Sequence, residues 1–140
     1  MIIHLSKIKK ILIAGSLLLI CVCCKKDTYQ NFPYVYVEEV LPATTLSSLT
    51  IGSAISVPGG VKGILIYQSG SYEYLAFDRL CTNYPNDTCA VVINSGVFAV
   101  CPCCKSKFLL SDGSVLRGPA KYGLKQYSAA FDGSRLNIRN

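Results

Sequence analysis

The sequence predicts an all-β domain built as an antiparallel sandwich or barrel. Short segments rich in β-branched and aromatic residues recur over residues 34–138 and alternate with turns containing glycine, proline, asparagine or aspartate. No segment shows the 3.6-residue apolar period of an amphipathic helix. Short strands at regular spacing with glycine-rich turns are typical of small β sandwiches and barrels.

An export signal is predicted over residues 1–24. Three lysines form a positively charged start, and residues 11–23 form an apolar run of the length found in signal peptides. The run is short for a membrane-spanning helix, although an uncleaved membrane anchor is the alternative. In either case we expect the domain to be exported.

The junction after this apolar run resembles the lipidation site of bacterial lipoproteins, in which a cysteine becomes the lipidated first residue. Cys24 is the expected site, with Cys23 and Cys21 as alternatives. The resemblance implies a protein held by its lipid in a membrane of the cell envelope, with the domain facing the periplasm or the cell exterior. Residues 25–33 lack any periodic pattern and suit a tether.

The charge balance gives no support to nucleic-acid binding. The chain has fourteen Lys and Arg against eight Asp and Glu. Three of the lysines belong to the signal, so eleven basic residues remain, mostly spread singly along the chain. A nucleic-acid-binding domain would show a basic cluster or stripe.

The strands are expected in the following order. Residues 34–40 form a first strand, and residues 43–57 form a loop followed by a short strand. Three hairpins follow, each closed by turn-forming residues, and a strand at 107–110 lies between the second and the third. The hairpins pair residues 62–68 with 72–78, 90–93 with 97–100, and 126–131 with 135–138.

Cysteines in two of the connecting turns indicate a metal site. Cys101 and Cys104 have the C-x-x-C spacing of a metal knuckle, with Cys103 between them. One knuckle supplies two of four tetrahedral ligands, so the turn over residues 81–89, with a cysteine at each end, is its natural partner. Exported cysteines ordinarily form disulfides. However, three cysteines within four residues cannot all easily find partners of good geometry.

These motifs resemble those of Rieske domains over about residues 57–138. Residues 74–81 resemble the strand that enters the first Rieske box, and residues 101–108 resemble the second box. Residues 118–120 resemble the proline loop, and the turn at 132–133 resembles that of the closing hairpin. The resemblance implies a Rieske-like domain over residues 34–140, with an inserted metal-binding lobe at about 78–121.

Both histidine ligands of a Rieske centre are replaced in this chain. A Rieske [2Fe-2S] cluster is held by two cysteines and two histidines. Asn83 and Cys104 stand at the histidine positions, and His4, in the signal, is the only histidine of the chain. The exported part therefore cannot build a two-histidine cluster from its own side chains.

We expect thiolates to rebuild the metal centre, because they suit both iron-sulfur clusters and zinc. The predicted ligands are Cys81, Cys89, Cys101 and Cys104. Cys103 is then a spare thiol. The alternative without metal is a disulfide from Cys81 or Cys89 to Cys103 or Cys104. In some Rieske proteins the position of Cys103 forms a disulfide, and here only Cys89 stands near its usual partner's place.

Three functions remain open at this point. The resemblance implies a [2Fe-2S] protein that transfers single electrons to an unnamed partner, at a lower potential than a Rieske centre because its ligands are all thiolates. A zinc ion on four cysteines would make the domain a structural or binding module. A disulfide-stapled fold without metal is the third. An enzyme is not expected, since a Ser-His-Asp or Cys-His arrangement needs a histidine.

Overall fold

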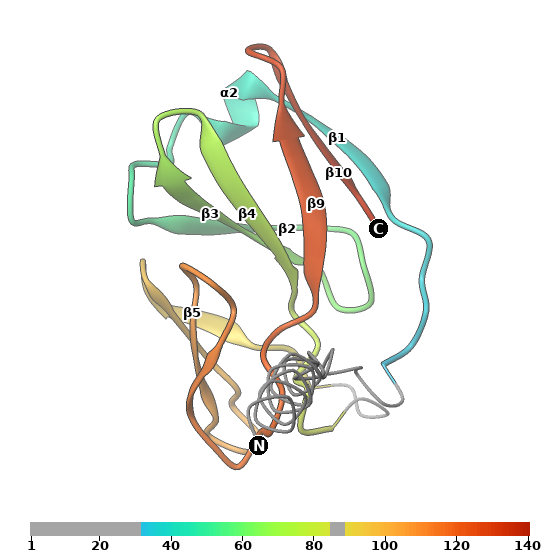
Figure 1. Cartoon of the computed structure of the whole chain (residues 1–140), viewed down its shortest axis with the longest axis vertical. Helices are drawn as coiled ribbons and strands as arrows, with labels where there is room; N and C mark the ends of the chain where they lie inside the picture. Colours follow the sequence, from blue (N-terminus) through green and yellow to red (C-terminus); the bar gives the residue numbers. More distant parts are fainter. Residues whose placement is uncertain (1–31, 85–88) are drawn as a thin grey trace, which may run out of the picture.

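The computed structural model describes residues 32–84 and 89–140 (Figure 1). The predicted signal, the lipidation site at Cys24 and most of the tether lie outside these residues. Within the two described ranges, the chain has no helix with the length and apolar character needed to span a membrane.

Antiparallel strands dominate the fold, which confirms the all-β prediction. A six-stranded sheet and a four-stranded sheet lie one above the other in Figure 1, where β5 marks the smaller one. The six-stranded sheet has the order β1 (Glu38–Pro42), β10 (Arg135–Arg139), β9 (Gln126–Phe131), β4 (Glu73–Asp78), β3 (Ile64–Gly70) and β2 (Ala54–Val57). The four-stranded sheet has the order β5 (Val92–Ser95), β6 (Phe98–Val100), β7 (Lys107–Leu109) and β8 (Val115–Arg117).

The smaller sheet is an insertion between two neighbouring strands of the larger one. β4 and β9 pair directly through Ala76 and Tyr127, although the four strands β5 to β8 lie between them in the chain. The chain therefore leaves the large sheet at the end of β4, builds a small lobe, and returns to the same place. Both cysteine-bearing turns belong to this lobe.

Two apolar cores lie on opposite faces of strands β3 and β4. In β3, Ile64 and Ile66 face one core while Leu65 and Tyr67 face the other. Side chains alternate between the faces of a strand, so a strand covered on both faces reads as a continuous apolar run.

We call the two cores the sheet core and the cysteine core. The sheet core consists of Val37, Leu46, Leu49, Val57, Ile64, Ile66, Ala76, Tyr127, Leu136 and Ile138. The cysteine core consists of Leu65, Tyr67, Phe77, Cys81, Cys89, Val91, Ala99, Cys101, Phe108, Leu110, Ala120 and Leu124.

The start of the domain differs from the prediction. The first strand covers Glu38–Pro42 rather than residues 34–40, because its partner β10 ends opposite Glu38, at Arg139. Pro42 is tolerated because β1 is an edge strand, where the N–H that proline lacks is not needed for pairing with a neighbouring strand. One helical turn, α2 (Ala43–Leu46), follows where a loop was expected, and it buries Leu46 in the sheet core.

Candidate metal centre

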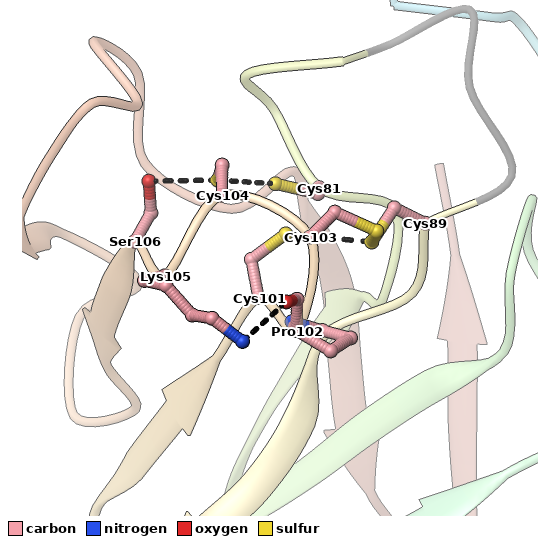
Figure 2. The surroundings of a disulfide bond; sticks show 8 residues. All are labelled: Cys81, Cys89, Cys101, Pro102, Cys103, Cys104, Lys105 and Ser106. Atoms are coloured by element: carbon pink, nitrogen blue, oxygen red, sulfur yellow. Dashed lines mark hydrogen bonds between the residues drawn. A yellow bond between two sulfur atoms is a disulfide. The ribbon is translucent and has the colours of Figure 1, made fainter.

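Two loops of the small lobe bring the cysteines together (Figure 2). The first loop follows β4 and carries Cys81 and Cys89, whose backbones are joined by a hydrogen bond from Cys81 N–H to the Cys89 carbonyl, 3.0 Å. The second loop joins β6 to β7. It is closed by a hydrogen bond from Cys101 N–H to the Ser106 carbonyl, 2.9 Å. Backbone bonds within each loop therefore hold the cysteine positions.

The second loop turns sharply at Lys105. Its backbone has φ +62°, in the left-handed region that is unfavourable for a residue with a side chain. The turn lets Lys105 N–H donate to the Cys101 carbonyl, 2.9 Å. The Lys105 ammonium group donates to the Pro102 carbonyl, 2.8 Å (Figure 2). These bonds fold the loop so that Cys101 and Cys104 point to the same side.

Three free thiols meet between the loops. Among residues 32–84 and 89–140, the free cysteines are Cys81, Cys101 and Cys104. Their sulfur atoms all lie within 4.8 Å of one another, and those of Cys81 and Cys104 are 3.5 Å apart. A tetrahedral zinc site with Zn–S bonds of about 2.3 Å has sulfur–sulfur edges of about 3.8 Å. The separation of the Cys81 and Cys104 sulfurs is therefore close to what a bound ion requires.

The fourth predicted ligand is engaged elsewhere. Cys89 forms a disulfide with Cys103, fourteen positions along the chain. This is the pairing that the family resemblance implied, and Cys103 is accordingly not a spare thiol in this structure. The Cys89 sulfur also lies 3.5 Å from the Cys101 sulfur. The structure thus gathers three of the four predicted ligands and places Cys89 beside them in a disulfide, so the four-cysteine set stays a prediction.

Ser106 polarises the least buried of the three thiols. Partial burial acts to raise the pKa of Cys104, but hydrogen bonds from the hydroxyl and backbone N–H of Ser106, together with those from Cys101 and Cys81, outweigh it, and the pKa is lowered. The Ser106 hydroxyl oxygen accepts a bond from Ala120 N–H, 2.9 Å, so its proton is available for the Cys104 sulfur at 3.0 Å. By contrast, burial raises the pKa of Cys81, with a further contribution from Cys101.

Asp78 anchors the base of the first loop. This fully buried carboxylate accepts bonds from Val61 N–H, 2.6 Å, from Leu80 N–H, 2.6 Å, and from the Tyr127 hydroxyl, 2.7 Å. Burial and the neighbouring Asp78 carboxylate raise the pKa of Tyr127. Val61 and Tyr127 are 17 and 49 positions away from Asp78 in the chain, so no local pattern identified them as its partners. Its place at the end of a strand was the available signal.

The available ligand atoms determine which metal ions or clusters this site can hold. Asn83 and Cys104 stand where a Rieske centre has histidines, and the chain's only histidine is His4, so a two-histidine cluster does not fit. The three thiols fit a single soft metal ion, because thiolate ligands select ions such as zinc and monovalent copper. A [2Fe-2S] cluster on four thiolates fits only if Cys89 leaves its disulfide.

Known structures share this fold. The chain is similar to the plasma membrane Rieske protein of the cyanobacterium Synechocystis PCC 6803, with 21% identity, a TM-score of 0.56, and coverage of 76% of this chain and 100% of that one. It is also similar to the ferredoxin of carbazole 1,9a-dioxygenase from Nocardioides aromaticivorans IC177, with 16% identity, a TM-score of 0.51, and coverage of 76% and 98%.

A further match is a complex of reduced oxygenase and oxidised ferredoxin in carbazole 1,9a-dioxygenase, with 16% identity and a TM-score of 0.52. It covers 79% of this chain and 94% of that one. No family model matches the chain, and no curated protein matches it. These similarities confirm a Rieske-like fold, as the sequence motifs predicted.

Proposed function

We propose that this chain is an exported, lipid-anchored protein of Rieske-like fold that binds a metal centre on thiolates and transfers single electrons. One observation carries the proposal: the sulfurs of Cys81, Cys101 and Cys104 lie within 4.8 Å of one another between the two loops of the small lobe. Cys81 and Cys101 stand at the cysteine positions of the Rieske motif, and Cys104 at a histidine position. An electron carrier, rather than an enzyme, fits this site.

The fold favours a [2Fe-2S] cluster as the metal centre. The similar proteins are described as a Rieske protein and as ferredoxins, one of them in a complex with a reduced oxygenase. The ligands would be Cys81, Cys101 and Cys104, with Cys89 as the fourth after its disulfide opens. When bound, such a cluster accepts and releases one electron, at a low potential because all its ligands are thiolates.

A single zinc ion is the second candidate, and the closed disulfide favours it. With Cys89 bonded to Cys103, three free thiols remain among the residues that the structure describes, which is one fewer than a cluster needs. Zinc is satisfied by three protein ligands and a water, or by four sulfurs. In this case the ion would join the two loops, and the domain would be a binding or structural module without redox chemistry.

Metal analysis and an absorbance spectrum of the purified full-length chain test the proposal. Iron, sulfide and visible bands support the cluster, whereas a colourless protein with one equivalent of zinc supports the second candidate. Protein free of both metals, with Cys81, Cys101 and Cys104 as thiols and Cys89 bonded to Cys103, would contradict the proposal and leave a disulfide-stapled domain.

Two serine variants supply the matched control for metal binding. Cys81→Ser removes one of the three gathered thiols and should abolish binding of either metal. Cys103→Ser removes a sulfur outside the three-thiol set and should retain it. Equal retention by both variants would show that the bound metal is elsewhere.

The lipid anchor has its own test. We expect Cys24→Ala to release the protein from membranes, while Cys21→Ala and Cys23→Ala leave it attached. The similarity to a plasma membrane Rieske protein supports a membrane location for this chain. Continued attachment of the Cys24→Ala protein would show that lipid is not joined there.

A further inference from the structure

We infer that the Cys89–Cys103 disulfide controls the number of sulfur ligands at the metal centre: three while it is closed, and four, with Cys89 added, once it is reduced. The inference rests on the proposed function, because it concerns the same metal centre. It assigns Cys89 two alternative roles and gives Cys103 the role of holding it out of the ligand set.

The disulfide lies directly against the three-thiol group. The Cys89 sulfur is 3.5 Å from the Cys101 sulfur (Figure 2). A sulfur in a disulfide has no hydrogen, so the Cys101 thiol is the donor in this contact. The separation is close to the edge of about 3.8 Å between two sulfurs that bind one zinc ion. Cys89 is therefore already placed beside one ligand of the site.

The two halves of the disulfide face different surroundings. Cys89 is 5% exposed and belongs to the cysteine core, whereas Cys103 is exposed at the surface of the second loop. After reduction, burial keeps the Cys89 side chain among the other sulfurs, while Cys103 is free to turn toward solvent. Of the two released thiols, only Cys89 is positioned to join the metal.

The backbone keeps Cys89 in reach without the disulfide. The hydrogen bond from Cys81 N–H to the Cys89 carbonyl ties the two residues together at 3.0 Å. The disulfide turns the Cys89 side chain toward Cys103. The Cys89 sulfur therefore does not lie within 4.8 Å of both the Cys81 sulfur and the Cys104 sulfur. Breaking the S–S bond releases the side-chain torsion. Cys89 then needs a rotation rather than a loop movement to reach the site.

The chemical step is a two-electron reduction. A dithiol reductant supplies two electrons and two protons, the Cys89–Cys103 bond breaks, two cysteine thiols form, and the reductant becomes a disulfide. Cys89 would then supply a fourth sulfur to the ion and release its thiol proton to solvent. Zinc accepts both arrangements, and four sulfurs give the closed tetrahedron of a structural site.

X-ray absorption of Zn²⁺ bound to the full-length chain counts the sulfur ligands directly. Before reduction we expect three sulfurs and one lighter oxygen neighbour. After reduction with the phosphine TCEP we expect four sulfurs and loss of the lighter neighbour. The same sulfur count before and after complete reduction would overturn the inference.

Two variants separate Cys89 from Cys103, since each removes the disulfide and one sulfur. Cys103→Ser leaves Cys89 free and should show four sulfurs with or without TCEP. Cys89→Ser should show three under both conditions. Identical counts in the two variants would contradict the inference while leaving the metal site intact. If the wild-type chain binds neither Zn²⁺ nor an iron-sulfur cluster in either state, the proposed function itself fails, and the inference falls with it.

Discussion

The sheet core and the cysteine core share strands β3 and β4 but are stabilised differently. The sheet core contains only aliphatic side chains and Tyr127, so its stability depends on the burial of hydrocarbon. The cysteine core buries Cys81, Cys89 and Cys101 among aliphatic and aromatic side chains. Its packing therefore depends in part on the chemical state of sulfur. The small lobe therefore contains sulfur groups that respond to redox conditions, whereas the sheet core contains no such groups.

Truncating one large side chain in each core should give the largest effects. Phe108→Ala in the cysteine core should lower the free energy of unfolding by about 3–5 kcal/mol, and Leu136→Ala in the sheet core by about 2–5 kcal/mol, because each leaves a cavity. Both residues are fully buried. Denaturant unfolding measures these losses.

The two variants should differ in the reactivity of Cys101. Phe108 lies at the exit of the second loop, in β7, whereas Leu136 lies in β10. Phe108→Ala should therefore increase the rate at which Cys101 is alkylated under native conditions, and Leu136→Ala should leave it nearly unchanged. Equal acceleration by both variants would show that the two cores open as one unit.

Reducing the disulfide should have the next largest effect. Cys89 and Cys103 are 14 positions apart, and opening a loop of this length costs about 3 kcal/mol of stability through the entropy of the unfolded chain. A thermal melt of metal-free protein with and without TCEP measures the loss. Cys103→Ser, which has no such bond, should melt at the same temperature in both solutions, and a shift there would point to another reducible group.

The left-handed turn at Lys105 should have a smaller effect. Its φ of +62° suits glycine better than any residue with a side chain. Lys105→Val should cost about 1–3 kcal/mol, because a β-branched side chain is strained in this region. Lys105→Gly, the matched control, removes the strain and the bond to Pro102 together and should stay within about 1 kcal/mol of wild type. Chemical denaturation measures the free energy of unfolding of both variants. Equal losses in Lys105→Val and Lys105→Gly would show that the lost ammonium contact, and not backbone strain, causes the destabilisation.

The smallest effect should come from the closing hairpin, away from the cysteines. Backbone N–H groups of Ser134 and Arg135 lower the pKa of Asp132 below its usual value of about 3.9. A carboxyl whose pKa is lower in the folded state than in the unfolded state stabilises the fold at pH values above its unfolded-state pKa. This contribution is lost as the pH falls through the folded-state pKa.

Asp132→Ala should therefore be less stable than wild type at about pH 6, with the difference shrinking toward about pH 2. Urea unfolding at the two pH values checks this. Asp132→Asn, which keeps an oxygen for both N–H groups, should retain most of the stability at about pH 6. A difference between wild type and Asp132→Ala that is constant with pH would show that the charge plays no part.

Local patterns were sufficient for most of the fold. The closing hairpin was predicted within one residue, because strand propensity and a strong two-residue turn at residues 132–133 act within a short stretch of chain. The first strand was misplaced, since its length depends on where the distant partner β10 ends. The single turn of α2 has too few residues to show a period.

The cysteine pattern alone determined that two loops would come together around sulfur, because C-x-x-C spacing and strand-end turns are local features. Only the tertiary structure decided how five sulfurs divide into three thiols and one disulfide. That division depends on which side chains are buried and which lie within bonding distance across two loops, since Cys89 and Cys103 are fourteen positions apart. Such distances arise from the packing of the whole lobe, and no spacing along the chain records them.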